Sequence, residues 1–257
     1  MITGGASGIG LATAERLARA GCALALVDIK QNTLDEAAAR VRALGARCST
    51  HIADVSDRAV MAALPARVRE AHDAIHILMN NAGVASFGKF EGHSLEDFEW
   101  VLGINLWGVI HGCKFFLPHL READEGHIVN TASMAAFVGM PGQSSYCVSK
   151  SGVRALGQSL AAELHGTPIG ITTVLPGAVE TGIVAGARGS DANKRTISEL
   201  MRSAIPPGEV ARRIEGAILE NETELVVCRE AHAMHWASRL VPGGLRRVLA
   251  RSNRIES

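Results

Sequence analysis

The chain has 257 residues, of which 47% are hydrophobic and 20% are charged, a composition that supports a substantial core and argues against disorder. Its 26 basic and 26 acidic side chains cancel, so no overall field favours nucleic acid or an anionic membrane surface as a partner. Five scattered cysteines without a C-x-x-C pair predict reduced thiols, a cytoplasmic location and no metal site.

In chain order, short apolar runs alternate with longer amphipathic stretches. The runs expected to form strands are 23–29, 75–83, 126–133, 170–177 and 223–228. The stretches expected to form helices are 11–20, 32–44, 58–71, 95–117, 145–164 and 207–219. Nearly continuous apolar strands are buried on both faces, as in a parallel sheet covered by helices. The order therefore predicts one α/β domain over 1–257, a three-layer, doubly wound parallel sheet.

The start of the chain is irregular, because only Met1, Ile2 and Thr3 precede a glycine-rich turn. Three residues are too few for a full central strand. Either the first strand is a stub, or Met1 is an internal position of a longer chain, and we favour the second reading.

The turn itself, "TGGASGIG" at residues 3–10, has glycines at 4, 8 and 10 and leads into the first helix. Gly4 permits the turn, Gly8 lets the backbone approach a pyrophosphate, and Gly10 allows close packing of the helix, as in a Rossmann-like domain. The helix N-terminus adds a partial positive charge of about half a unit. By itself the motif is also compatible with a plain glycine turn between a strand and a helix.

Asp28 strengthens the nucleotide interpretation. It ends the second apolar run 18 residues after Gly10, close to the spacing of about 20 at which a carboxylate accepts hydrogen bonds from an adenosine ribose. A carboxylate there would repel a 2′-phosphate, and Lys30 is the one cation nearby that could soften this effect. The prediction is NAD rather than NADP.

Tyr146 is the only tyrosine of the chain, and Lys150 follows it by four positions, on the same face of a helix. An isolated phenol has a pKa of about 10, and a close ammonium favours the charged form. Ser133 ends the run 126–133, where a serine can equally be a strand-end residue that faces water. Tyr146 and Lys150 are candidates for acid–base chemistry.

The glycine turn, "NNAG" at 80–83, Ser133, Tyr146-x-x-x-Lys150 and "PG" at 176–177 together resemble the short-chain dehydrogenase/reductase family in its single-domain form. The resemblance extends from Thr3 to about Cys228. It implies an oxidoreductase that interconverts a secondary alcohol and a ketone by hydride transfer to or from NAD.

The resemblance implies a role for each catalytic residue. Tyr146 would be the general acid in reduction and, as phenolate, the base in oxidation. Lys150 would lower the pKa of Tyr146 and hold the nicotinamide ribose, Ser133 would stabilise the substrate oxygen, and Asn105 would position Lys150 through a water.

The resemblance also implies the cofactor contacts. Asp54 and Val55 would meet the adenine, and Val179 and Thr181 the carboxamide. The full set is Gly4, Ser7, Gly8, Ile9, Gly10, Asp28, Asp54, Val55, Asn81, Ala82, Gly83, Tyr146, Lys150, Pro176, Gly177, Val179 and Thr181.

The substrate is expected to be a hydrophobic alcohol or ketone, because the loops 84–90, 134–144 and 182–206 are rich in apolar residues. We expect 182–206 to act as a mobile substrate lid and 229–257 to form a C-terminal extension. Two alternatives stay open: an NADPH-dependent reductase of carrier-bound acyl chains, and an NAD-binding sensor or scaffold without turnover.

The resemblance further implies a homo-oligomer, a dimer or tetramer, joined through the helices at 100–116 and 146–164. In the tail, Leu245, Val248 and Leu249 predict a short helix with arginines off its apolar stripe. We expect this helix to dock within the oligomer rather than on a membrane, because its apolar face is small. Truncation after Val241 should then change the assembly or the Michaelis constant.

Overall fold

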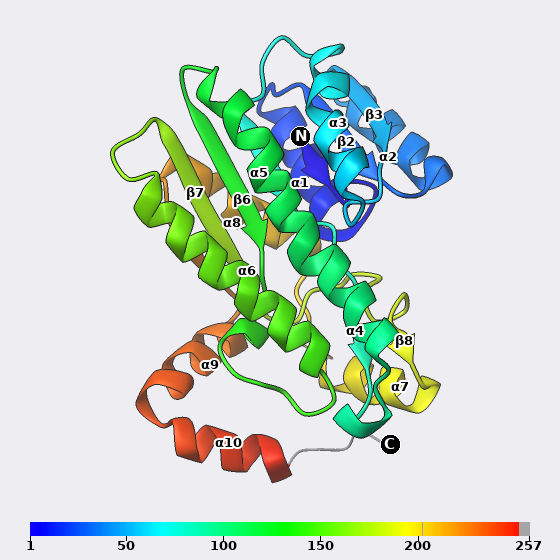
Figure 1. Ribbon diagram of the computed structural model, residues 1–257, viewed down its shortest axis with the longest axis vertical. Coiled ribbons are helices and arrows are strands. Elements are labelled where there is room, and N and C mark those ends of the chain that lie inside the picture. The colour runs from blue at the N-terminus through cyan, green and yellow to red at the C-terminus, as the bar shows by residue number, and fades with distance from the viewer. Residues whose placement is uncertain (202, 252–257) are drawn as a thin grey trace.

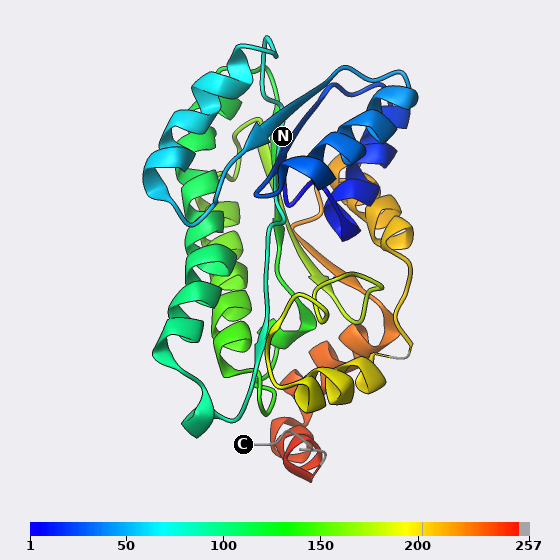
Figure 2. The same cartoon turned by 90° about the vertical axis from the view of Figure 1, so that its right-hand side faces the viewer.

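A seven-stranded parallel sheet lies between two layers of helices in the computed structural model, which describes residues 1–201 and 203–251 (Figures 1 and 2). The strand order is β3-β2-β1-β4-β6-β7-β9. The strands are β1 (Ile2–Thr3), β2 (Leu24–Asp28), β3 (Cys48–Ile52), β4 (Ile77–Asn80), β6 (Gly126–Thr131), β7 (Ile169–Pro176) and β9 (Glu224–Val227). This is the single doubly wound α/β domain that the alternation of apolar runs and amphipathic stretches predicts.

Two sets of helices cover the two faces of the sheet. One face carries α1 (Gly8–Arg19), α2 (Gln31–Ala43) and α8 (Pro207–Leu219). The other carries α3 (Arg58–Arg69), α4 (Leu95–Leu102), α5 (Gly108–Arg121) and α6 (Ser144–Glu163). The sheet is buried on both faces, and every residue of β6 is buried, including the polar side chains of His127, Asn130 and Thr131.

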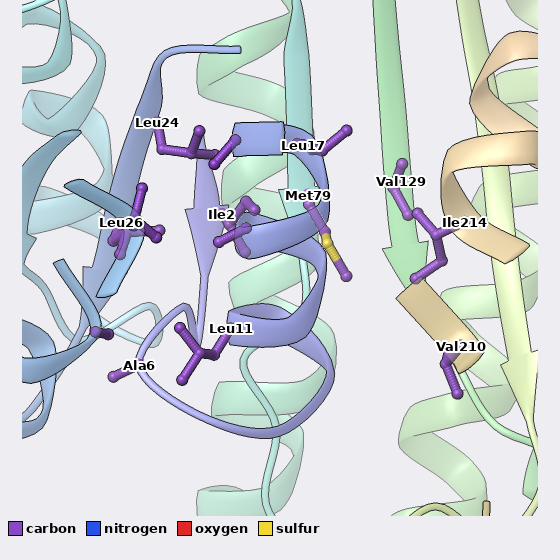
Figure 3. Close-up of a cluster of buried hydrophobic side chains, with 14 of the residues drawn as sticks. Ile2, Ala6, Leu11, Leu17, Leu24, Leu26, Met79, Val129, Val210 and Ile214 are labelled. Atoms are coloured by element: carbon purple, nitrogen blue, oxygen red, sulfur yellow. The ribbon is translucent and has the colours of Figure 1, made fainter. Parts of the chain in front are cut away.

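Figure 3 shows part of the core beneath α1 and α8. Leu17 of α1 lies near Ile2 and Met79, whereas Ile214 of α8 lies beside Val129 of β6, and four of these five side chains are at most 1% exposed. Burying one such side chain contributes about 1.5–3 kcal/mol. This packing holds α1 against the sheet and thereby fixes the glycine turn that precedes the helix.

Two elements of the seven-stranded sheet and its covering helices differ from the expectation. Strand β3 was not predicted, because its sequence "CSTHI" is mostly polar, and it lies at the edge of the sheet beside β2. The helix expected over 95–117 is divided into α4 and α5 by a π-helical turn, η2 (Gly103–Trp107). Asn105 lies in this turn with its side chain fully buried.

The first strand is the two-residue stub β1. Ile2 pairs with Leu26 on one side and with Met79 on the other. The strand therefore lies at the centre of the sheet in spite of its length, and Thr3 carries the chain directly into the glycine turn.

One helical stretch of the described residues, Leu95–Arg121, is long and apolar enough for a membrane span, with a mean hydropathy of 1.3. It is the α4–α5 run, and Val101, Val109, Phe116 and Leu120 on it are buried in the core. Packing of a core helix accounts for its apolar composition.

The remaining elements gather at the carboxyl end of the sheet (Figures 1 and 2). They include the short parallel pair β5 (Ser86–Phe87) and β8 (Arg188–Gly189) and the helices α7 (Asp191–Leu200), α9 (Arg229–Leu240) and α10 (Pro242–Arg251), together with the 3₁₀ turns η1 (Phe90–Gly92) and η3 (Met134–Ala136). Position 202 of the expected lid and positions 252–257 of the expected extension lie outside the described residues.

Candidate active site

A cavity of about 760 Å³ opens at the carboxyl ends of the strands. It lies where the strand order reverses between β1 and β4, the position at which open α/β sheets bind ligands. It extends from Asp28 at the end of β2 to Tyr146 on α6 and the lid residues beyond it. One continuous cavity therefore joins the predicted nucleotide site to the predicted catalytic side chains.

The glycine turn forms one wall of this cavity. Gly4 and Gly8 have φ values of +61° and +53°, a conformation that favours glycine. A Cβ at Gly10 would collide with the carbonyl oxygen of Gly4, so the turn can close only with glycine there. Ser7 is the N-cap residue of α1 and its side chain makes no capping bond. The hydroxyl of Ser7 and the first amide groups of α1 therefore face the cavity in the way an anionic phosphate requires.

Asp28 lies at the other side of the turn. Its carboxylate accepts hydrogen bonds from the amides of Ala6, at 3.2 Å, and Ile29, at 2.8 Å. Lys30 lines the cavity next to it, as do Asp54 and Val55 after β3. The carboxylate of Asp54 accepts two bonds from Ser56, from its amide at 2.9 Å and its hydroxyl at 2.6 Å, which fixes the turn after β3.

Tyr146, Lys150 and Ser133 meet at the middle of the cavity. Tyr146 and Lys150 lie one turn apart on α6, and the Nζ of Lys150 is 5.7 Å from the centre of the Tyr146 ring. Lys150 is 3% exposed and donates a hydrogen bond of 2.8 Å to the carbonyl oxygen of Thr131, at the end of β6. Ser133 follows this strand and is hydrogen-bonded to the Tyr146 hydroxyl.

The electrostatics of the pair differ from the expectation in one respect. Burial raises the pKa of Tyr146 to about 12, and the hydrogen bond with Ser133 only partly offsets this effect. Burial lowers the pKa of Lys150 to about 8. The sequence argument expected Lys150 to lower the pKa of Tyr146; here desolvation of the phenol is the largest effect, and the group that lowers the pKa is Ser133. Tyr146 is therefore protonated at neutral pH and can donate its proton.

Asn105 lies behind the catalytic residues. Its side-chain amide donates to the carbonyl oxygen of Val84 and accepts from the amide of the same residue, at 2.9 and 2.8 Å. It also donates to the hydroxyl of Ser149 on α6 at 3.2 Å. A Cβ placed on Gly83 would lie 3.4 Å from Asn105 Oδ1 and 3.5 Å from Lys150 Nζ, so both polar groups border the space beside Gly83.

Asn81 ties the glycine turn to β4. Its Nδ2 donates to the carbonyl oxygens of Thr3 and Gly4, at 3.1 and 3.2 Å, and its backbone amide donates to Thr3 Oγ1 at 2.9 Å. Asn81 therefore shapes the turn as well as lining the cavity.

The segment after β7 forms the opposite wall of the cavity. The start of α9 adds to this wall a residue that the sequence analysis did not identify. Glu230, at the start of α9, lines the cavity and accepts a hydrogen bond from the amide of Ala178 at 3.1 Å. A Cβ on Gly177 would lie 2.6 Å from its carboxylate, so Gly177 is needed for this contact. No sequence motif marks Glu230, because its approach depends on the pairing of β9 with β7.

The far end of the cavity is mostly apolar. Gln143, Ser203 and Glu230 are its polar side chains beyond Tyr146. The apolar ones are Phe87, Trp100, Ile104, Met134, Met140, Ile183, Val184, Ile197 and Met201. The sequence analysis did not associate Trp100 or Ile104 with the substrate, and both reach the cavity from α4 and η2. Ile197 lies within the expected lid and reaches the cavity from α7.

The structure brings the predicted site residues together around one cavity. Gly10 and Asn105 do not line it and instead support its walls from behind; every other predicted residue faces the cavity. Within residues 1–201 and 203–251 no group of three His, Cys, Asp or Glu side chains is arranged to hold a metal ion.

Comparisons with known proteins agree with this geometry. A sequence model of the family described as "short chain dehydrogenase" matches residues 1–191. "Probable oxidoreductase EphD" from Mycobacterium tuberculosis is 36% identical over 95% of this chain, which spans only 43% of that relative's length. "Putative oxidoreductase SadH" from the same species is 31% identical, with 97% of this chain and 93% of the relative covered.

Among solved structures, a short-chain dehydrogenase/reductase from Burkholderia phymatum in complex with NAD superposes with a TM-score of 0.87. The two chains are 30% identical, and the match covers 100% of this chain and 95% of the other.

Proposed function

The chain belongs to the short-chain dehydrogenase/reductase family, and from this premise we propose that it interconverts a hydrophobic secondary alcohol and the corresponding ketone with NAD(H). Members of this family are oxidoreductases that bind a nicotinamide cofactor. The observation that carries the proposal is the single cavity in which a carboxylate at the ribose position, Asp28, and the Tyr146–Lys150 pair face the same space.

The walls of the cavity fit a dinucleotide. The open Ser7 hydroxyl and the N-terminus of α1 suit the pyrophosphate, and Asp28 presents a carboxylate for the adenosine ribose. We propose that the remaining contacts come from the residues that line this part of the cavity: Gly4, Gly8, Ile9, Asp54, Val55, Asn81, Ala82, Gly83, Pro176, Gly177, Val179 and Thr181. Gly10 supports the turn.

NAD fits the charges better than NADP. Asp28 would repel a 2′-phosphate, whereas it can accept hydrogen bonds from the hydroxyls of an unmodified ribose. Lys30 lines the same part of the cavity, and its positive charge would partly offset the repulsion of a 2′-phosphate by Asp28. We therefore expect NADP to bind more weakly than NAD rather than to be excluded.

The protein groups supply the proton chemistry, while a bound nicotinamide supplies or accepts the hydride. In reduction, Tyr146 holds its proton at neutral pH and donates it to the substrate oxygen. With substrate bound, the hydroxyl of Ser133, which otherwise bonds to Tyr146, would donate to the same substrate oxygen and stabilise its developing charge. Lys150 is held by the Thr131 carbonyl, and Asn105 is held by Val84, so both polar groups stay in place behind the tyrosine.

The substrate proposal rests on the far end of the cavity. Its apolar side chains favour a bulky hydrophobic alcohol or ketone. We propose 182–206 as the lid over this end and 229–257 as a C-terminal extension beside it. All five cysteines are unpaired, which suits a reducing, cytoplasmic compartment.

We also propose a homo-oligomer, a dimer or tetramer. Trp107 at the end of η2 and Val148 on α6 are 55% and 52% exposed. Both lie on the helices that the sequence resemblance assigns to subunit contacts.

The test is reduction of a panel of hydrophobic ketones, steroid-like and aliphatic, followed through NADH consumption. We expect turnover with at least one ketone, and a higher kcat/KM with NADH than with NADPH. Tyr146→Phe should reduce turnover at least 10³-fold and leave NADH binding nearly unchanged, because it removes the proton and keeps the ring. NADH binding without turnover on the whole panel would favour the sensor or scaffold, and a preference for NADPH would favour the acyl-chain reductase.

A further inference from the structure

The C-terminal helices carry charge and apolar surface that the catalytic site does not use. Residues 231–251 contain four arginines, Arg239, Arg246, Arg247 and Arg251, and no aspartate or glutamate. The chain as a whole is neutral, with 26 basic and 26 acidic side chains. This short segment is therefore a local concentration of positive charge.

These arginines are exposed and unpaired in the described structure. All four are exposed, and none takes part in an ion pair between described residues. The same helices expose large apolar side chains: Trp236 is 55% exposed, Leu240 72%, Val241 58% and Val248 63%. No side chain of α10 is buried. We call these eight residues the tail surface.

The tail surface is larger than α10 alone provides. The three aliphatic residues of α10 form a weak face by themselves, and Leu245 and Leu249 among them are half-buried. The fold adds Trp236 and Leu240, one turn apart on the exposed side of α9, and Val241 between the helices. An exposed tryptophan with aliphatic neighbours and arginines is the composition of a helix that lies in the interface of a bilayer.

The tail surface lies at one end of the molecule. Figures 1 and 2 both place α10 at the tip of the carboxyl end, next to α9, and the beginning of α4 points the same way. Leu95, the first residue of α4, is 76% exposed, and Phe90 in the preceding turn is 73% exposed. The second segment also exposes Glu91 and Glu96 beside these apolar side chains, so the surface considered for docking is confined to the tail surface.

We propose that the tail surface docks on an anionic lipid membrane. The charge complementarity is direct, since four unpaired arginines face a surface of acidic headgroups, each of which attracts a basic side chain within about a Debye length. A second copy of the chain is a poorer partner, because a two-fold contact through this surface would bring like charges together.

The position of the cavity gives docking a consequence. The helix α9 begins beside Glu230, which lines the cavity, and the lid helix α7 lies at the same end. A docked molecule would hold the apolar half of its cavity close to the bilayer. An apolar substrate dissolved in lipid could then be captured without crossing bulk water.

The test is partition of the full chain onto vesicles, without cofactor or substrate, so that it does not depend on the proposed activity. We expect co-sedimentation with vesicles of equal parts phosphatidylglycerol and phosphatidylcholine at low salt. Binding should be at least ten-fold weaker with phosphatidylcholine alone, which removes the negative charge of the membrane. It should weaken as much in 0.5 M NaCl, because the Debye length then falls to roughly 5 Å or less and the salt screens the charge.

Matched variants locate the contact. The triple substitution Arg246→Gln, Arg247→Gln, Arg251→Gln should weaken partition at least ten-fold. The control triple Arg19→Gln, Arg58→Gln, Arg121→Gln removes the same charge from exposed positions on α1, α3 and α5 and should leave partition within two-fold. Equal losses in the two triples, or no binding of the wild type to the acidic vesicles, would overturn the proposal.

Tryptophan fluorescence reports the apolar part of the contact. Brominated phosphatidylcholine in the acidic vesicles should quench the wild-type emission, and Trp236→Phe should abolish the quenching while Trp100 and Trp107 still emit. A tail variant that changes the mass in light scattering but not the vesicle partition would show instead that the surface covers a second copy of the chain.

Discussion

At the scale of single residues, the proposed preference for NAD depends mainly on Asp28. We expect Asp28→Ala to weaken NADH binding about 10- to 100-fold, the scale of losing hydrogen bonds to a charged group. NADPH binding should change much less, because the same substitution removes a repulsion. Fluorescence titration with both cofactors measures the ratio. Asp124→Ala, at an exposed position after α5, is the control and should leave both affinities unchanged.

An NADH to NADPH ratio that stays the same in Asp28→Ala would assign the carboxylate to the turn instead of the ribose. Its hydrogen bonds to Ala6 and Ile29 give it a structural task of that kind. If Asp28 only holds the turn, Asp28→Ala should weaken NADH and NADPH binding by the same factor.

At the residue scale, the motifs and the loops chosen from the sequence contain most of the residues that line the cavity. Tyr146 and Lys150 need only a helix to face the same space, so a four-residue spacing predicts their contact. The pKa of Tyr146 was not predictable in this way, since it is set by burial, which depends on the lid and on the loop after β6. Glu230 escaped notice because its contact with Ala178 joins residues 52 positions apart.

At the scale of elements, the side chain of Arg188 joins the proposed lid to the body of the molecule. Arg188 of β8 forms an ion pair of 2.9 Å with Asp97 on α4, and its guanidinium lies 4.0 Å from the centre of the Trp100 ring. Trp100 lines the apolar end of the cavity, so the contacts of Arg188 connect the proposed lid to the proposed substrate site. An exposed ion pair and a cation–π contact of this kind contribute about 1–2 kcal/mol together.

We therefore expect Arg188→Ala to raise the KM for the ketone about 5- to 30-fold and to change kcat little, because an open lid weakens binding more than chemistry. Steady-state kinetics give the split, and limited proteolysis should cleave 182–206 faster. Arg195→Ala, exposed on the same lid, is the control. An unchanged KM would mean that the β5–β8 pairing alone holds the lid.

The elements missed by sequence reasoning have physical reasons. Strand β3 lacks the apolar run of its neighbours because it lies at the sheet edge and only Cys48 and His51 are buried in it. The π-helical turn leaves no mark on the apolar pattern, since Asn105 takes a buried position within it and its amide bonds to Val84 rather than to its own helix. The strong central strands and amphipathic helices were predictable because burial on a regular surface repeats along the sequence.

At the scale of the whole molecule, assembly can be tested through Trp107. We expect Trp107→Glu to shift the protein toward the 27.1 kDa monomer, because it places a charge on an exposed apolar patch of the proposed contact helices. Light scattering at micromolar concentration measures the mass. Leu219→Glu is the control, at a residue 81% exposed on α8 and therefore on the opposite face. A wild type that is already a monomer would contradict the oligomer.

Stability against acid is a second property of the whole fold. Burial lowers the pKa of His51 and of His127 to about 4, below the ordinary value of 6.5. The unfolded chain therefore binds protons between pH 6.5 and about 4 that the folded chain refuses, so stability falls as the pH drops through this window.

We expect the urea midpoint to decrease from pH 7 to pH 5, and the double substitution His51→Gln, His127→Gln to flatten this decrease. His76→Gln, at an exposed position, should keep the wild-type slope. A slope that the double substitution leaves unchanged would assign the acid sensitivity to other groups.

The pairing of β5 with β8 has a consequence for how this enzyme can change. The pair is held by backbone hydrogen bonds, with the amide of Arg188 donating to the carbonyl oxygen of Ala85 at 3.0 Å. Only Gly189 is tightly constrained there, since it has a φ of +118° and a Cβ on it would collide with the Phe87 carbonyl oxygen.

The side chains that shape the apolar end, Ile183, Val184, Ile197 and Met201, lie outside that two-residue anchor. Their side chains take no part in those backbone bonds, so we expect exchanges that keep the packing around Phe87 to preserve the β5–β8 pairing. We therefore expect the substrate preference of the proposed oxidoreductase to be separable from closure of the proposed lid, so that mutation or design can vary the substrate on an unchanged catalytic frame.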